Sequence, residues 1–164
     1  MPRNLLPERN FHPASSDISY YCYTPCEDGT IVCIYNNPVG AALDDPNAEV
    51  GPPQGTLADT IPAGVILQAF VEYDNTRYSR DMSDFEAMMV GNKAAVYHHG
   101  WCVTRCIDPA ADPVLSNKPA YYNMNGYFTT VAGSPCVGTF QSERDANGFA
   151  RVYVEIPAYG RQDS

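Results

Sequence analysis

The residues with the most obvious chemical potential are the six cysteines, Cys22, Cys26, Cys33, Cys102, Cys106 and Cys136. An even number of cysteines favours disulfides in an oxidising compartment, and two Cys-x3-Cys spacings could supply four thiolates to a zinc ion. On a strand, however, residues four apart lie roughly 13 Å from each other, and only Pro25 offers a turn within either pair. Buried free thiols, one or more disulfides and a zinc site therefore remain three alternatives. Free thiols are favoured, and no metal or other cofactor is predicted.

A second candidate is a Cys–His nucleophile formed by Cys102 and the adjacent histidines His98 and His99. His98 and Cys102 can share one face of a strand, but at roughly 13 Å they are too far apart for a hydrogen bond. The sequence has no nucleophile elbow or glycine-rich phosphate loop beside them, and its carboxylates are scattered among expected loops. We therefore expect no catalytic residues, and the sequence predicts a protein that is not an enzyme.

The composition favours β-structure and sets limits on the partners. The chain has 12 Tyr, 14 Pro and 12 Gly, which favour short strands separated by turns. Its net charge of −9 disfavours nucleic acid as a partner. The longest apolar patch, residues 64–67, is too short to cross a membrane. Because residues 1–8 also lack the apolar run of a signal peptide, we expect synthesis in the cytoplasm.

Alternating apolar residues and turn signals indicate where the strands lie. They are expected at residues 18–23, 30–35, 64–74, 93–107 with a break at Gly100, 120–123, 126–130, 136–140 and 149–156. The first two should form a hairpin, and the last four an antiparallel meander with a tight turn at Asn147-Gly148. Val152, Val154 and Ile156 point to one face of the last strand, and Arg151, Tyr153 and Glu155 to the other. The only expected helix spans residues 82–90, with Phe85, Met88 and Met89 on one face.

These elements predict a mostly-β fold, a compact antiparallel barrel or sandwich with at most one short helix. Residues 18–156 form its single domain, which includes a long irregular Pro-rich loop at 36–63. An extended arm at 1–17 precedes the domain, and a polar tail at 157–164 follows it. The arm is either a frayed terminus or an anchor on a neighbour, and the loop is either a plain insertion or a contact with a neighbouring subunit. The candidate contact residues are Leu5, Leu6, Phe11, Asp44, Asp45, Pro52, Pro53 and Trp101. Trp101, the only tryptophan, is either a core residue, which is favoured, or an anchor at an interface.

The order of motifs in the C-terminal part resembles the cement proteins of tailed-bacteriophage heads. These motifs are Asp112-Pro113-Val114, Gly126-Tyr127-Phe128-Thr129, Val137-Gly138-Thr139-Phe140 and Asp145-Ala146-Asn147-Gly148, followed by the alternating strand. The resemblance covers roughly residues 90–156, and the longer N-terminal part departs from the family's pattern. It implies a structural virion protein on the outer capsid surface that clamps neighbouring copies of the major capsid protein. It also implies a homo-oligomer, with a trimer favoured and a dimer as the alternative.

Other protein classes fit the composition alone. A carbohydrate-binding or host-adhesion β module displayed on a virion would gather exposed aromatics in a groove, and the 12 Tyr suit it. An enzyme or a metal-stabilised β protein would use the cysteines. On the capsid hypothesis, deletion of residues 1–17 should weaken attachment and leave the fold intact.

Overall fold

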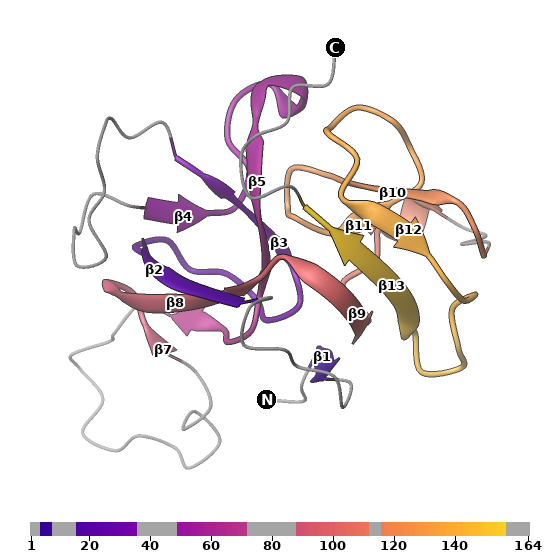
Figure 1. Cartoon of the computed structure of the whole chain (residues 1–164), viewed down its shortest axis with the longest axis horizontal. Helices are drawn as coiled ribbons and strands as arrows, with labels where there is room; N and C mark the ends of the chain where they lie inside the picture. The colour runs from indigo at the N-terminus through magenta and orange to yellow at the C-terminus, as the bar shows by residue number, and fades with distance from the viewer. Residues whose placement is uncertain (1–3, 8–15, 36–48, 72–87, 112–115, 157–164) are drawn as a thin grey trace.

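The fold was obtained as a computed structural model, which describes residues 4–7, 16–35, 49–71, 88–111 and 116–156. Within these ranges strands dominate, and the helical segments are short 3-10 turns such as η2 (Leu57–Asp59) and η4 (Pro109–Ala111). A closed five-stranded barrel stands beside a curled six-stranded sheet (Figure 1). The predicted mostly-β fold with a compact barrel is confirmed.

The barrel closes in the order β2-β4-β3-β5-β8. Its strands are β2 (Ser16–Cys22), β3 (Ile31–Ile34), β4 (Glu49–Gly51), β5 (Ile61–Ile66) and β8 (Asn92–Tyr97). The pairings are antiparallel except for β2 with β4, which is parallel. The expected hairpin of the first two strands is wrong, because β4 pairs with both of them and lies between them.

The six-stranded sheet has the order β1-β9-β13-β12-β10-β11, and all its pairings are antiparallel. Its strands are β1 (Leu5–Pro7), β9 (His99–Thr104), β10 (Pro119–Tyr122), β11 (Phe128–Thr129), β12 (Gly138–Phe140) and β13 (Ala150–Glu155). The predicted strands of the C-terminal part are present, but they do not form a simple meander. β12 skips β11 and pairs with β10, which leaves β11 at the edge.

The turn before β13 uses one positive φ angle where the sequence suggested two. Gly148 has a φ of +86°, whereas Asn147 is not among the described residues with positive φ. The Asp145 carboxylate accepts hydrogen bonds from the backbone N–H groups of Asn147 and Phe149 at 2.8 and 2.9 Å. The aspartate therefore closes the turn through its side chain, and the glycine supplies the single left-handed residue.

Two barrel strands, β3 and the second half of β5, are buried on both faces, which explains their nearly continuous apolar sequences. In β3, Val32 packs inside the barrel, whereas Ile31 and Cys33 belong to the core shared with the sheet. Ile66 of β5 likewise faces the barrel interior, and Val65 faces the sheet. The six-stranded sheet therefore packs against the outer face of β3 and β5.

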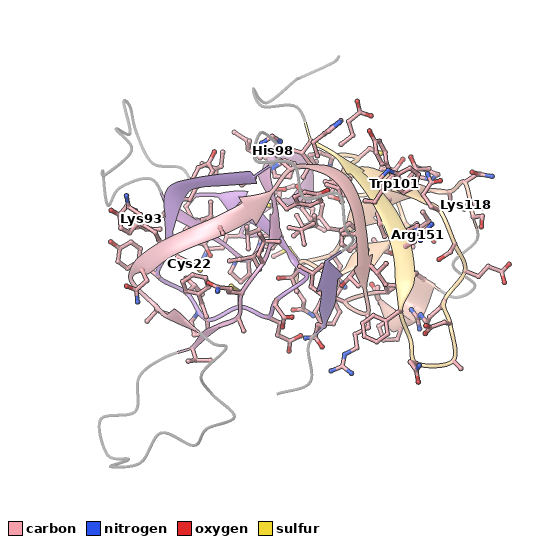
Figure 2. The ribbon with its side chains drawn as sticks, turned by 60° about the horizontal axis from the view of Figure 1, so that its bottom comes forward. Cys22, Lys93, His98, Trp101, Lys118 and Arg151 are labelled. Carbon is pink, nitrogen blue, oxygen red and sulfur yellow. The ribbon has the colours of Figure 1, made fainter. Side chains whose placement is uncertain are left out.

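A kink at His98 separates β8 from β9 and takes the chain from the barrel into the sheet (Figure 2). The sequence predicted either one long strand or a kinked pair here, with the break two residues later, at Gly100. Gly100 lies within β9 at a φ of +126°, and a Cβ there would collide with the Tyr97 hydroxyl. Glycine is therefore required beside the kink rather than at it.

The strand expected at residues 64–74 is interrupted after β5 by a bend at Leu67 and Gln68, and then resumes as β6 (Phe70–Val71). β6 pairs in parallel with β7 (Met88–Met89). The expected helix at 82–90 is therefore wrong for its last residues, which form this strand and a turn. The remainder of that prediction lies outside the described residues.

The N-terminal arm and the long loop are more ordered by pairing than the sequence indicated. Within the predicted arm, β1 pairs with β9, and β2 already begins at Ser16. In the described part of the predicted 36–63 loop, the chain forms β4, η2 and the start of β5. The tail at 157–164 lies outside the described residues.

Candidate functional site

The outward face of the six-stranded sheet carries a group of aromatic side chains that are wholly or partly exposed. β13 alternates as predicted, with Val152 and Val154 buried and Arg151, Tyr153 and Glu155 turned away from the core. The strand register places Trp101 of β9 opposite Tyr153, which in turn lies opposite Thr139 of β12. We call the set His99, Trp101, Thr139, Arg151 and Tyr153 the aromatic face.

Ring contacts fix the centre of the aromatic face. The ring centroids of Trp101 and Tyr153 lie 4.9 Å apart with an angle of 59° between the ring planes. His99 meets Tyr153 edge to face at 5.7 Å, and the Tyr153 hydroxyl lies 3.4 Å from His99 Nε2. Trp101 nevertheless remains 40% exposed. Figure 2 shows Trp101 and Arg151 over the sheet, far from the barrel end that carries Cys22.

Such a surface is suited to binding. Trp, Tyr and Arg are the residues that most often dominate the free energy of protein–protein association. Because Trp101 and Tyr153 stand on paired strands and touch each other, few side-chain rotamers have to be frozen when a partner arrives. The aromatic face is therefore largely ordered before any partner binds.

An open pocket of about 630 Å³ lies where β1 and the end of β9 approach the barrel. The acidic residues on its wall already have partners within the chain. Glu27 accepts a hydrogen bond of 2.7 Å from the Tyr127 hydroxyl, which raises the pKa of Tyr127 to about 12. The Asp28 carboxylate accepts the backbone N–H groups of Asn4 and Leu5. These contacts hold the walls of the pocket together.

Two cysteines of the first Cys-x3-Cys pair lie close together on one side of this pocket. Cys22 is fully buried, Cys26 lines the pocket, and their Sγ atoms are 3.7 Å apart. The hydrogen bond from Cys26 lowers the pKa of Cys22, whereas the same contact and burial raise the pKa of Cys26. The strand-based estimate of 13 Å does not apply to this pair, because β2 ends at Cys22 and the chain bends at Thr24.

The other four cysteines lie in different settings. Burial raises the pKa of Cys33 to about 11 and that of Cys106 to about 12. Cys102 is buried in the core, and Cys136 is exposed. Over the described ranges, no three His, Cys, Asp or Glu side chains gather closely enough to hold a metal ion. None of the helices in the part of the chain that is described is long and apolar enough to span a membrane.

The candidate contact residues from the sequence fall into different environments. Trp101, for which the sequence left a core position and an interface position open, is 40% exposed, whereas Leu5 is 5% exposed and belongs to the core of its own chain. Leu5 is therefore not available for contact with a neighbouring subunit, because its side chain is buried in the core of its own chain. Leu6 lies in β1, Pro52 is half-buried and Pro53 is buried. Phe11, Asp44 and Asp45 lie outside the described residues.

Tyr153 and His99 were not among those candidates, although a signal for Tyr153 existed. The alternation in residues 151–156 places Tyr153 on the solvent side of its strand. Its neighbour Trp101 lies far away in the sequence, so only the pairing of β9 with β13 brings the two rings together. His99 could not be assigned to this face without the position of the kink at His98.

No protein-family model matches the chain, and no curated protein sequence is detectably similar to it.

Proposed function

We propose that this chain is a structural virion protein of a tailed bacteriophage that binds the outer surface of the head and clamps neighbouring copies of the major capsid protein. The motif order from Asp112 to Ile156 supports the family, and the aromatic face supports a role in binding. The single observation that carries the proposal is the exposed Trp101, which is held against Tyr153 on a sheet that packs firmly on the barrel.

The clamping mechanism is multivalent contact. Each copy in a homo-oligomer, with a trimer favoured over a dimer, presents its own aromatic face to a capsid subunit. Subunits bound by one oligomer can separate only if several contacts break together, so weak individual contacts give strong attachment. The chain's net charge of −9 suits a basic or polar docking surface and keeps free copies apart.

The test uses the fact that Trp101 is the only tryptophan in the chain. Full-length protein carrying 5-fluorotryptophan is mixed with separately produced, unlabelled expanded head shells that lack this chain. We expect the protein to co-sediment with the shells and the single fluorine resonance to shift and broaden. Protein that stays in the supernatant with an unchanged resonance would refute the proposal.

A pair of variants distinguishes a loss of binding at the aromatic face from the effect of removing any exposed apolar side chain. Trp101→Ala should weaken attachment by about 30-fold per site, the equivalent of about 2 kcal/mol for a binding hot spot. Ile61→Ala is the matched control, because Ile61 is an exposed apolar residue (47%) on β5 of the barrel. Equal losses in the two variants would show that the aromatic face is not the docking surface.

A carbohydrate-binding or host-adhesion module is the second candidate, and the exposed aromatic pair also favours it. Sugar rings stack best on a flat platform, however, and the rings of Trp101 and Tyr153 are inclined by 59°. Quenching of Trp101 fluorescence by a soluble oligosaccharide, without binding to shells, would favour the second candidate.

A further inference from the structure

We propose that Cys22 and Cys26 form an oxidisable dithiol, which small-molecule disulfides convert into an intramolecular disulfide in the folded protein. The supporting geometry is the 3.7 Å contact between the two Sγ atoms, together with an open pocket that reaches one thiol and not the other. Closing the bond requires the sulfur atoms to approach to about 2.05 Å, a movement within reach of side-chain rotation.

Backbone hydrogen bonds on both sides hold the two thiols in place. Cys26 exchanges two hydrogen bonds with Phe70, at 3.0 Å from its N–H and 2.9 Å to its carbonyl. The Cys22 carbonyl accepts the N–H of Gly91 at 2.7 Å. Because both residues are anchored to different strands, their proximity is a property of the fold and does not depend on a chance encounter.

The two thiols differ in access, which assigns them different roles. Cys26 is half-buried and lines the pocket, so it can meet an external disulfide. Cys22 has no exposed surface, so it can react only with Cys26. Access and not acidity sets this division, because the contact between the thiols lowers the pKa of Cys22 and raises that of Cys26, yet only Cys26 reaches the pocket.

The proposed reaction proceeds in two exchanges. The Cys26 sulfur attacks a disulfide RSSR, a Cys26–SR bond forms, and RS⁻ leaves and takes up a proton as RSH. The Cys22 sulfur then attacks the Cys26 sulfur, the Cys22–Cys26 bond forms, and a second RSH leaves. Overall, two thiols are oxidised, one RSSR is reduced to two RSH, and the protein loses two hydrogen atoms.

The product would join the end of β2 to the bridge between Cys26 and Phe70, and so would fix one wall of the pocket to the barrel. This chemistry does not depend on capsid attachment. If the chain is carried on a virion, synthesis in a reducing cytoplasm and release into an oxidising medium would supply the two redox conditions.

The experiment treats the folded, full-length protein with oxidised glutathione at mildly alkaline pH. A Cys136→Ser background removes the exposed thiol, which would otherwise bind glutathione. After an acid quench, the remaining thiols are alkylated under denaturing conditions and the protein is analysed by intact and fragment mass spectrometry. We expect a species that has lost two hydrogens, carries no glutathione and links Cys22 to Cys26.

Single substitutions test the two roles. In the same background, Cys22→Ser should trap a stable glutathione adduct on Cys26, because no thiol remains to displace it. Cys26→Ser should leave Cys22 unmodified, and Cys106→Ser, which removes another buried thiol from the pocket wall, should still form the link. Two results would overturn the proposal: both thiols remaining free under conditions that fully modify Cys136 of the unaltered chain, or a link that forms only after denaturation.

Discussion

The buried hydroxyl of Tyr122 joins the six-stranded sheet to the barrel. It lies 2.7 Å from the Thr60 hydroxyl, and Thr60 in turn donates to the Leu57 carbonyl at 2.6 Å. Because the proton of Thr60 is already used, Tyr122 must be the donor between the two hydroxyls. Burial raises the pKa of Tyr122 and keeps this donor protonated at neutral pH.

We predict that Tyr122→Phe lowers the free energy of unfolding by about 1 kcal/mol, the usual net value of one hydrogen bond. Urea denaturation monitored by circular dichroism measures the change. Tyr121→Phe, at the next and less buried position of β10, should have a smaller effect. Combining Tyr122→Phe with Thr60→Ala should cost less than the sum of the two changes, and strict additivity would contradict the assigned bond.

At the scale of single residues, the sequence determined neither exposure nor proximity reliably. It left Trp101 open between a core position and an interface anchor, and only the fold places this side chain on the surface. The contact of Cys22 with Cys26 was missed, because the strand spacing was applied across a bend that Pro25 already suggested. Leu5 was assigned to the surface since neither its pairing with β9 nor the core above that strand can be inferred from a short arm.

Among the elements, β1 is held by few contacts, so the effect of removing one of them on stability can be measured. It has only three residues, and Leu5 is its described contribution to the core. The Asp28 carboxylate binds the backbone N–H groups of Asn4 and Leu5 at 2.9 and 3.1 Å. We predict that Asp28→Ala destabilises the protein by about 1–3 kcal/mol, because two N–H groups lose a charged acceptor.

Hydrogen exchange distinguishes this local role from a general one. In Asp28→Ala the amides of Asn4 and Leu5 should exchange much faster, whereas those of β12 and β13 should change only as far as global stability does. Asp59→Ala removes an exposed carboxylate from η2 and should leave both measurements nearly unchanged. For the same reasons, deletion of residues 1–17 should also lower stability, contrary to the expectation from the sequence.

The elements that the sequence predicted well are those with local signals. The alternation in β13 and the glycine turn before it lie within one stretch of the chain, so no partner strand is needed to recognise them. β4 could not be predicted, because three residues between prolines are too few to show an alternation of apolar and polar side chains. Their pairing with β2 and β3 joins segments that lie apart in the sequence. The same limit applies to β7, whose pairing with β6 replaces the end of an expected helix.

In the molecule as a whole, one core joins the barrel to the sheet and encloses ionisable thiols. Cys33 is 2% exposed within this core, and Cys106 is equally buried beside Asp28. Burial raises their pKa values from 9.0 to about 11 and about 12. The folded state therefore holds two protons that the unfolded chain releases above its thiol pKa, so folding is coupled to pH in the alkaline range.

We predict that the free energy of unfolding stays level up to about pH 9, where both states keep these protons, and falls between pH 9 and pH 11–12. Each thiol can contribute a slope of up to about 1.4 kcal/mol per pH unit within its window. Urea titrations at fixed pH steps, with reductant present to prevent thiol oxidation, measure this decline. The raised pKa of Tyr122 should extend the decline towards higher pH.

The change in the free energy of unfolding with pH, rather than its value at any one pH, shows whether the buried thiols cause the alkaline loss of stability. The double substitution Cys33→Ala and Cys106→Ala will lower stability at every pH, because it leaves space in the core, but it should make the decline above pH 9 shallower. Cys26, whose pKa is also raised, continues to contribute in this variant. Cys136→Ala alters an exposed position and should leave the slope unchanged.

Repulsion among the negative charges of this chain, whose net charge is −9, also increases as the pH rises. Added salt reduces that repulsion without affecting the buried thiols. An undiminished slope in the double variant at high salt would therefore assign the alkaline loss of stability to other groups.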